Sequence, residues 1–141
     1  MKHQQLKTTP EISKRMSRVH LKRGPVESKL AKALWHRGIY YRLNVRKLPG
    51  SPDIVIRKYK IVIFVDGEFW HGKDWEQKKE KLKNNKSYWI EKIEENMARD
   101  KRVDEQYIRE DWTVLRFWSK QVEKELDWCV ESVMAAVEMR R

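Results

Sequence analysis

The hydrophobic positions along the chain predict helices and strands in alternation. Apolar residues recur every three or four positions after Gly24-Pro25, which predicts a helix that ends near Gly38. The same spacing returns from Ser87 onward and again after Ser119, which we interpret as the N-cap of a last helix. Runs rich in β-branched and aromatic residues between these helices predict strands at residues 40–44, 53–57, 61–66 and 112–118.

The connections between these elements predict a mixed β-sheet flanked by helices, in the α/β class. Only residues 58–60 separate the second and third strands, so we expect a tight hairpin there. A long helical segment lies between the third and fourth strands, and such a crossover connection is typical of parallel strands. Residues 67–86 are polar and irregular in pattern, which indicates a loop. The expected order is helix, three strands, helix, strand, helix.

Charge adds a candidate partner to this fold. The chain has 141 residues, with 32 lysines and arginines against 21 acidic residues, and a formal net charge of +11. Residues 1–23 form a basic arm that includes Lys14 and Arg15, and residues 24–141 are expected to form one domain. The arm is either a partly ordered tail or a segment that grips nucleic acid. The charge as a whole fits a phosphate-rich partner.

Several classes of protein are excluded by what the sequence lacks. Cys129 is the one cysteine, so neither an intramolecular disulfide nor a cysteine-rich zinc site can form. No apolar run approaches the roughly 20 residues that a membrane helix needs. The first residues also open no apolar stretch of the kind that a secretory signal carries. We therefore expect a cytoplasmic protein with no membrane partner.

Two aspartates are placed to meet at the open end of the predicted hairpin. A turn at Tyr59-Lys60 would pair Lys58 with Ile61 and, further along, Asp53 with Asp66. Like charges directly opposed on neighbouring strands destabilise a sheet unless something offsets them. A divalent cation such as Mg²⁺ would do so, since it favours one or two carboxylates together with water and phosphate. The alternative is that both aspartates are solvated strand ends.

The loop after the third strand carries further candidate chemistry. Gly67 lets the backbone turn, and Phe69, Trp70 and His71 follow it. The two aromatic residues either close the end of the sheet or insert between base steps of a duplex. His71 is either a surface histidine or a general acid or base. Phosphodiester hydrolysis needs a cation that neutralises developing charge and a polarised water for the attack. The paired acids, the histidine and the basic surface would supply these parts, and no competing catalytic motif is visible.

The order and spacing of several short motifs resemble the very short patch repair endonucleases, which nick DNA beside the thymine of a T:G mispair. The resemblance covers roughly residues 10–120 and rests on several segments. These are Ser13-Lys14-x-Met16 with Glu27, Leu48-Pro49-Gly50-Ser51-Pro52-Asp53, the strand Ile61–Val65, Gly67-x-Phe69-Trp70-His71, Tyr88-Trp89-x-Glu91-Lys92-Ile93, Asn96-x-x-Arg99-Asp100-x-Arg102 and Trp112-x-Val114-Leu115-x-x-Trp118. The resemblance implies the restriction-endonuclease-like fold.

The resemblance also implies roles for single residues. Asp53 matches an aspartate that ligates Mg²⁺, and Val65 falls where the family uses a backbone carbonyl as a further ligand. His71 matches the histidine next to the scissile phosphate, and Asp100 matches the aspartate that orients it. Glu27 matches an acid of the first helix near the active centre. Met16, Phe69 and Trp70 fall on the residues that wedge into the duplex, which favours mispaired double-stranded DNA as the partner.

The sequence departs from this family pattern in two places. The positions of a structural zinc site read Glu68, Lys73, Trp75 and approximately Lys120, so we expect no structural zinc. Packing of Trp75 or an ion pair between Glu68 and a lysine would stand in its place. The second departure is Asp66, which replaces a histidine and is interpreted here as a further Mg²⁺ ligand and catalytic acid.

Three functions follow from these observations, in descending order of support. The first is a magnesium-dependent endonuclease that nicks double-stranded DNA beside a T:G mismatch in very short patch repair, acting as a monomer at the nucleoid. The second is a restriction-type or mobile-element nuclease of the same fold that cuts matched DNA. The third is a non-catalytic basic module that binds nucleic acid, in which Asp53 and Asp66 only end their strands.

Overall fold

A computed structural model describes residues 24–82 and 85–141, and its elements follow the predicted order. Pro25 occupies the first turn of the first described helix, and Gly38, with a φ of 80°, lies just after its end. The elements are α2 (Pro25–His36), β1 (Arg42–Leu43), β2 (Ile54–Ile56), β3 (Ile61–Asp66), α3 (Trp75–Lys79), α4 (Lys86–Arg109), β4 (Thr113–Trp118), α5 (Ser119–Lys124) and α6 (Leu126–Arg140).

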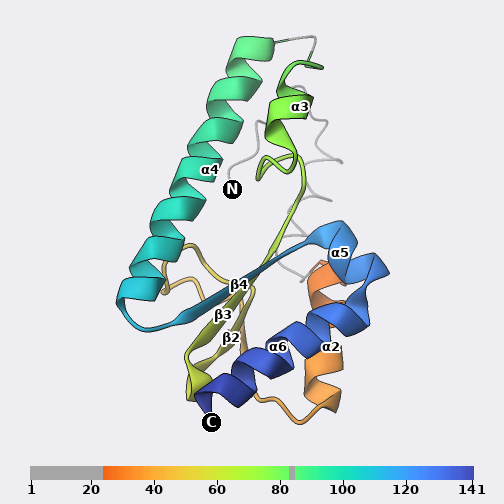
Figure 1. Ribbon diagram of the computed structural model, residues 1–141, viewed down its shortest axis with the longest axis vertical. Coiled ribbons are helices and arrows are strands. Elements are labelled where there is room, and N and C mark those ends of the chain that lie inside the picture. Colours follow the sequence, from red (N-terminus) through yellow and green to blue (C-terminus); the bar gives the residue numbers. More distant parts are fainter. Residues whose placement is uncertain (1–23, 83–84) are drawn as a thin grey trace, which may run out of the picture.

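The strands form one mixed sheet in the order β1-β2-β3-β4. The pairs β1–β2 and β2–β3 are antiparallel, whereas β3 and β4 are parallel and joined through α4. This confirms the predicted crossover and the α/β class. In Figure 1, α4 lies on one side of the sheet and extends past it beside α3, while α2, α5 and α6 gather on the other side. The architecture is consistent with the restriction-endonuclease-like fold.

The predicted hairpin turn between β2 and β3 is too short by two residues, both on the side of β2. A 3₁₀ turn at Arg57–Tyr59 and Lys60 in the left-handed conformation, with φ 54°, make a four-residue connection. Ile56 therefore pairs with Ile61, and the whole register moves by two residues from the expected one. The amide of Lys60 donates to the carbonyl of Arg57 at 3.2 Å, which closes this longer connection.

Two other expectations about helices need correction. The polar segment predicted as a loop contains the short helix α3, in which Trp75 is buried. The predicted last helix is divided into α5 and α6 at Glu125, whose φ of −131° is not helical. Ser119 is the first residue of α5 rather than its N-cap, and its hydroxyl donates instead to Glu68 of the loop after β3. A carboxylate from another part of the chain thus serves the start of this helix.

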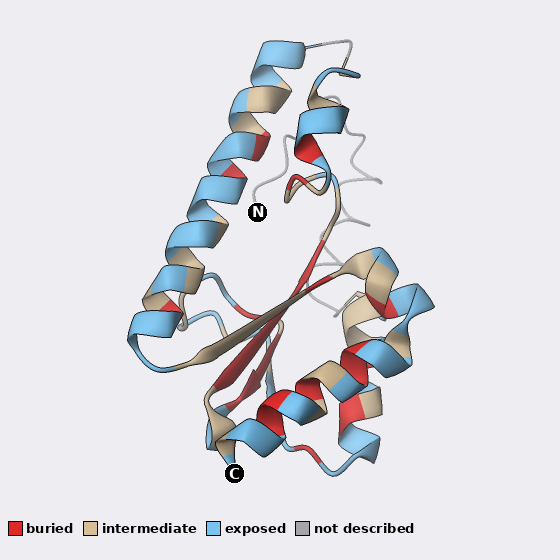
Figure 2. Cartoon of the chain, viewed as in Figure 1, coloured by how far each residue is buried: buried red, intermediate tan, exposed pale blue. Residues whose placement is uncertain are grey.

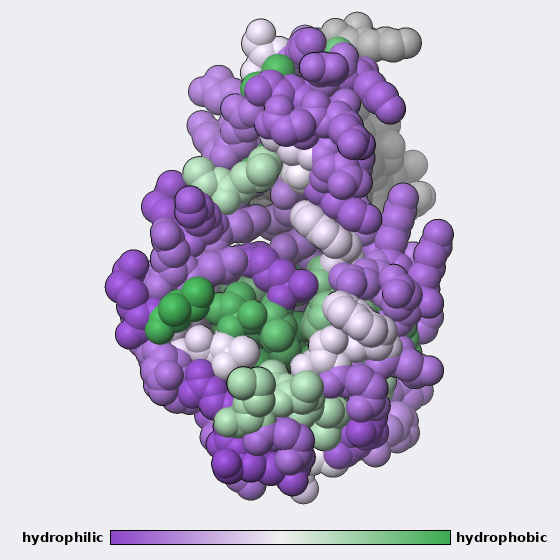
Figure 3. Space-filling model, in the orientation of Figure 1, coloured by the Kyte–Doolittle hydropathy of each residue, from purple (hydrophilic) through white to green (hydrophobic). Residues whose placement is uncertain are grey.

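The larger apolar cluster lies on the face of the sheet that α2, α5 and α6 cover. Side chains alternate along a strand, so every second residue of β2 and β3 points to this face. Figure 2 shows both strands as buried, and Figure 3 shows apolar atoms gathered in the half of the molecule that holds the sheet and α6. The strand residues of this cluster are Ile54, Ile56, Ile61, Ile63 and Val65.

The opposite face carries a smaller cluster. Val55, Val62 and Phe64 pack there against Tyr107 of α4, which is 1% exposed. The Tyr107 hydroxyl donates to the carbonyl of Pro49, in the segment that leads to Asp53. The smaller cluster therefore joins α4, the sheet and the approach to β2, next to the predicted acidic residues.

No described helix, in residues 24–82 and 85–141, is both long and apolar enough to cross a membrane. The predicted basic arm, residues 1–23, lies outside the described residues.

Candidate active site

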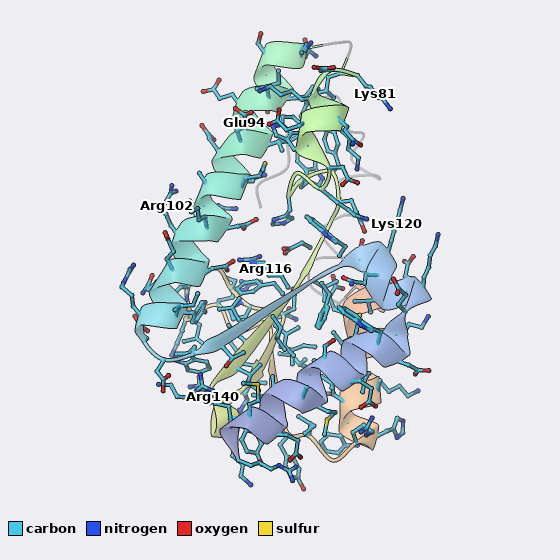
Figure 4. All side chains as sticks on the ribbon, viewed as in Figure 1. Lys81, Glu94, Arg102, Arg116, Lys120 and Arg140 are labelled. Carbon is cyan, nitrogen blue, oxygen red and sulfur yellow. The ribbon has the colours of Figure 1, made fainter. Side chains whose placement is uncertain are left out.

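A cavity of about 370 Å³ lies between α4 and the face of the sheet that carries the smaller cluster. It begins where Phe64 ends the apolar part of this face. Figure 4 shows Arg116 between the ribbon of α4 and the sheet, at the level of this cavity. The charged and titratable side chains that line it are Asp53, Asp66, His71, Arg99, Asp100 and Arg116. Four residues singled out from the sequence are thus brought together.

Asp53 and Asp66 line this cavity without being directly opposed on their strands. The observed register places Asp53 one step beyond the pair of Ile54 with Ile63, so it lies opposite Phe64. A shift of two residues keeps every side chain on its original face of the sheet, because side chains alternate with a period of two. The expected pairing is therefore wrong, but both carboxylates still face α4.

Asp53 is a partly buried carboxyl group just before β2. Its Oδ2 accepts a hydrogen bond from the backbone amide of Val65 at 2.7 Å. Burial raises the pKa of Asp53 to about 6, against the lowering effect of the Val65 hydrogen bond, and the charges of Glu27 and Asp66 raise it further. A carboxylate in such surroundings is stabilised by any cation that enters the cavity.

Asp66 ends β3 and is held by an arginine of β4. The Arg116 Nη1 lies 2.9 Å from Asp66 Oδ2 and 3.2 Å from Asp66 Oδ1. The same guanidinium donates to Asp104 of α4, with Nε 2.9 Å from Oδ1 and Nη2 2.8 Å from Oδ1. Burial raises the pKa of Asp66, while the charges of His71 and Arg116 act in the opposite direction. Arg116 therefore connects the last residue of β3 to α4.

His71 is fixed by an aspartate of α4. Its Nδ1 lies 2.6 Å from Asp100 Oδ2, and its Nε2 lies 3.8 Å from Asp66 Oδ1. Burial alone would lower the pKa of His71, but the hydrogen bond to Asp100 and the charge of Asp66 outweigh it and raise the pKa. The expected contact between His71 and Asp100 is present, with Nε2 directed to the side of Asp66.

The side chains of Asp66, His71 and Asp100 are close enough to hold a cation, with one ligand atom from each within 4.8 Å of the others. Their hydrogen bonds show that they already have partners, since Asp66 bonds Arg116 and Asp100 bonds His71. Among the described residues, Asp53 accepts a hydrogen bond from a backbone amide and none from a charged side chain, and burial raises its pKa to about 6. Of these acids, Asp53 has the most to gain from a cation.

Glu27 lies in the first turn of α2, outside the residues that line the cavity. Its charge nevertheless reaches Asp53 and helps to raise the pKa of that group. The Glu27 Oε2 is buried and has no hydrogen-bond partner among the described residues. An acid of the first helix is therefore close to Asp53, as the family resemblance implied.

Phe69 and Trp70 lie together in the loop after β3. Their ring centroids are 5.2 Å apart, and both rings contact Trp89 of α4, at 5.8 and 5.5 Å. The Asn96 side chain donates to the carbonyl of Trp70 at 3.1 Å. Phe69 is 38% exposed, and neither ring belongs to the two described core clusters. Together with Trp89 they form a separate aromatic group between the loop after β3 and α4, and His71 follows Trp70 in the chain.

Glu68 and Trp75, which stand at positions of the family's structural zinc site, make other contacts in this structure. Glu68 accepts a hydrogen bond from the Ser119 hydroxyl at 2.7 Å and another from the backbone amide of Lys120 at 2.8 Å. Burial would raise the pKa of Glu68, and these two hydrogen bonds lower it below its usual value. Trp75 is 5% exposed, and its Nε1 donates to Glu94 at 2.9 Å. The bond of Glu68 is thus to the backbone of Lys120 rather than to its ammonium group.

Three predicted site residues lie in the N-terminal segment, and one residue of the site was missed. Met16, Lys14 and Arg15 lie outside the described residues. Arg116 was not singled out, although it is the one charged residue in the strand Thr113–Trp118. A lone arginine inside an otherwise apolar strand is the signal that could have found it.

The fold and the cavity define a class: a restriction-endonuclease-like domain with acids and a histidine at the end of a mixed sheet. Residues 5–77 match the family described as DNA mismatch endonuclease Vsr. The chain belongs to this family and is a DNA endonuclease of the Vsr type.

Relatives from several bacteria extend the match beyond those residues. The chain is 48% identical to the type II nicking enzyme V.NmeDIP of Neisseria meningitidis serogroup C, over 92% of this chain and 88% of the relative. It is 48% identical to the type II nicking enzyme V.HpaIIP of Haemophilus parainfluenzae, over 84% of this chain and 85% of the relative. It is 34% identical to the DNA mismatch endonuclease Vsr of Escherichia coli K12, over 75% of this chain and 67% of the relative.

Proposed function

We propose that this protein nicks one strand of double-stranded DNA beside a T:G mismatch and that the reaction depends on Mg²⁺. The observation that carries the proposal is the cavity itself. It sets the partly buried Asp53 carboxyl beside a histidine that an aspartate holds at 2.6 Å. The names of the relatives, which are nicking enzymes and a mismatch endonuclease, support the same reaction.

The residues around Asp53 fit a magnesium ion. Mg²⁺ prefers hard oxygen ligands and commonly keeps one or two carboxylates with water and phosphate oxygens. Asp53 supplies a partly buried carboxyl with a pKa raised to about 6, and the nearby Glu27 Oε2 is buried without a partner among the described residues. In the proposal, Asp53 and the backbone carbonyl of Val65 hold the ion. When bound, the ion would neutralise charge that develops on the phosphate and would polarise the attacking water.

His71 and Asp100 supply the proton chemistry in this proposal. The hydrogen bond to Asp100 at Nδ1 fixes the imidazole ring and leaves Nε2 as the atom that exchanges a proton with the substrate. Because Asp100 raises the pKa of His71, the imidazole holds a proton more readily than a free histidine at neutral pH. Either the attacking water or the leaving oxygen is the proton partner.

Selectivity for a mismatch is assigned to the aromatic group. Phe69 and Trp70 precede His71 in the loop after β3 and pack against Trp89 of α4, and Phe69 is already partly exposed. An apolar side chain inserted between base steps must unstack them, and a mispaired step is cheaper to open. We expect these rings, together with Met16, to enter the duplex, while Lys14, Arg15 and Glu27 act at the margin of the site.

The experiment is a nicking assay on two duplexes that differ only in one base pair, T:G or matched, each with Mg²⁺ or with EDTA. We expect one strand of the T:G duplex to be cut beside the thymine when Mg²⁺ is present. The matched duplex should remain intact, and EDTA should stop the reaction.

Two outcomes would contradict the proposal in different ways. Equal cutting of both duplexes would favour a nuclease that acts on matched DNA. Binding of both duplexes without any cutting in Mg²⁺ would favour a non-catalytic nucleic-acid module. Light scattering of the enzyme alone and with DNA would test the further expectation that it acts as a monomer.

A further inference from the structure

His71 lies between two carboxylates but is bonded to only one of them. Its Nδ1 is 2.6 Å from Asp100, whereas its Nε2 is 3.8 Å from the nearest oxygen of Asp66. A charge-assisted hydrogen bond between nitrogen and a carboxylate spans about 2.7–2.9 Å. A movement of about 1 Å would therefore be enough for Asp66 to bond Nε2. Another group must therefore hold the Asp66 carboxylate away from Nε2 of His71.

Arg116 is the group that holds Asp66 away. One nitrogen of its guanidinium contacts both carboxylate oxygens, at 2.9 and 3.2 Å. The Asp66 side chain is 9% exposed, so water cannot replace a lost partner at little cost. Among the described residues, His71 and Arg116 are the cationic groups whose charges act on Asp66. If Arg116 were absent, Asp66 would be left with His71.

The position of Arg116 is fixed independently of Asp66. In the parallel register Arg116 lies beside Phe64, and its guanidinium carbon is 4.1 Å from the centroid of that ring. Nε and Nη2 are bonded to Asp104 of α4. The arginine therefore offers Asp66 a partner that is already in place. Asp104, with a side chain that is 31% exposed, can turn to water if the arginine is lost.

We propose that Arg116 is a positioning residue that keeps Asp66 bonded to itself and so leaves Nε2 of His71 free to face the DNA. In this arrangement Asp66 is the hydrogen-bond partner of Arg116 rather than a ligand of a metal ion. The proposal rests on the nuclease function proposed above, because it concerns the histidine of that site. It adds a residue of β4, absent from the sequence-based set, to the machinery that prepares the reaction.

The main test compares Arg116→Met with the double variant Arg116→Met/Asp66→Asn in the nicking assay. Methionine keeps the length of the side chain and its packing on Phe64 but removes the cation. We expect Arg116→Met to lower the nicking rate about a hundredfold, within the range that general acid or base catalysis supplies, because Asp66 now bonds Nε2. Asparagine is neutral and nearly isosteric with aspartate, so it should bond Nε2 less strongly. The double variant should therefore nick at no less than about a tenth of the wild-type rate.

Two further variants control for folding. Arg140 also ties its helix to the edge of β4, through Thr113 and Asp111, and its side chain is 24% exposed against 20% for Arg116. Arg140→Met should therefore leave nicking unchanged. Arg116→Lys keeps a positive charge beside Asp66 but loses the fork to Asp104, so it should fold and nick faster than Arg116→Met. An equal loss of nicking rate in folded Arg116→Lys and folded Arg116→Met would overturn the proposal.

A second readout needs no nuclease activity. Nitrogen NMR of histidine-labelled protein, with His71→Gln to assign the signal, reports which ring nitrogens are hydrogen-bonded. We expect a bonded Nδ1 and an exchanging Nε2 in the wild type, and a second protected proton at Nε2 in Arg116→Met. An unchanged Nε2 signal, or no recovery of nicking in the double variant, would refute the role of Arg116. Failure of the wild type to nick, with the NMR change present, would instead refute the nuclease function alone.

Discussion

The two faces of the sheet are built from the same strands and serve different purposes. Along β3, Ile61, Ile63 and Val65 enter the larger hydrophobic cluster. The intervening positions begin in the smaller cluster with Val62 and Phe64 and end at Asp66 in the cavity. On one face of β3 the residues are therefore apolar at the start and lead to a charged site residue at the end. On the other face of β3 the residues are apolar along the whole strand.

The difference shows how charged groups can be buried without disrupting the fold. Asp66 and Arg116 bond each other at 2.9 Å on the face of the smaller cluster, and Val65, next to Asp66, packs in the larger cluster on the other face. Buried ion pairs contribute little net stability, because desolvation offsets their attraction. Burial of apolar surface on the other face supplies the stability that the site does not.

The largest expected effect on stability comes from the apolar face. Ile63 is fully buried in the larger cluster, so Ile63→Ala should lower the free energy of unfolding by about 2–5 kcal/mol. Urea unfolding followed by tryptophan fluorescence measures this change. Ile108→Ala is the matched control, since Ile108 is 65% exposed on α4 and should change stability by less than about 0.5 kcal/mol. Similar losses in both variants would mean that the larger cluster does not dominate stability.

A smaller effect is expected from pH on the same face. Burial raises the pKa of the Cys129 thiol to about 11, and the charge of Glu125 adds to it. The folded protein thus holds this proton more tightly than the unfolded chain, so the contribution of Cys129 to stability should fall as pH rises from about 9 to about 11. Alkylation by iodoacetamide at pH 8 should be slow in the native protein and fast in urea. Rapid alkylation of the native protein at pH 8 would show that the reagent reaches Cys129 and would contradict its burial in the larger cluster.

The sequence predicted the elements better than it predicted their alignment. Periodicity located α2, α4, β3 and β4, because apolar spacing directly reflects which side of an element is buried. The hairpin register could not be read in this way. It depends on Lys60 adopting a left-handed conformation in a four-residue connection, and the composition of that segment did not indicate this. The faces were still correct, since the register moved by two residues.

The candidate site was predictable where the chain itself brings residues together. The segments around Asp53 and Asp66 belong to adjacent strands, so a hairpin alone placed both at one end of the sheet. The contact between His71 and Asp100 was expected from the family resemblance and is present. Arg116 was missed because its partners depend on the parallel pairing of β3 with β4 and on the position of Asp104. No local pattern around Arg116 encodes those distances.

The central claim is that the charged end of the smaller face, with Asp53 at its centre, is the active site. The measurement that tests it most directly is the rate at which Asp53→Asn nicks the T:G duplex in Mg²⁺. Asparagine can still accept the hydrogen bond from Val65, and it removes a carboxyl group that is unfavourable to bury. The variant should therefore melt no lower than the wild type and bind DNA as well, but should nick at least about a hundredfold more slowly. A folded Asp53→Asn protein that nicks at the wild-type rate would contradict the account.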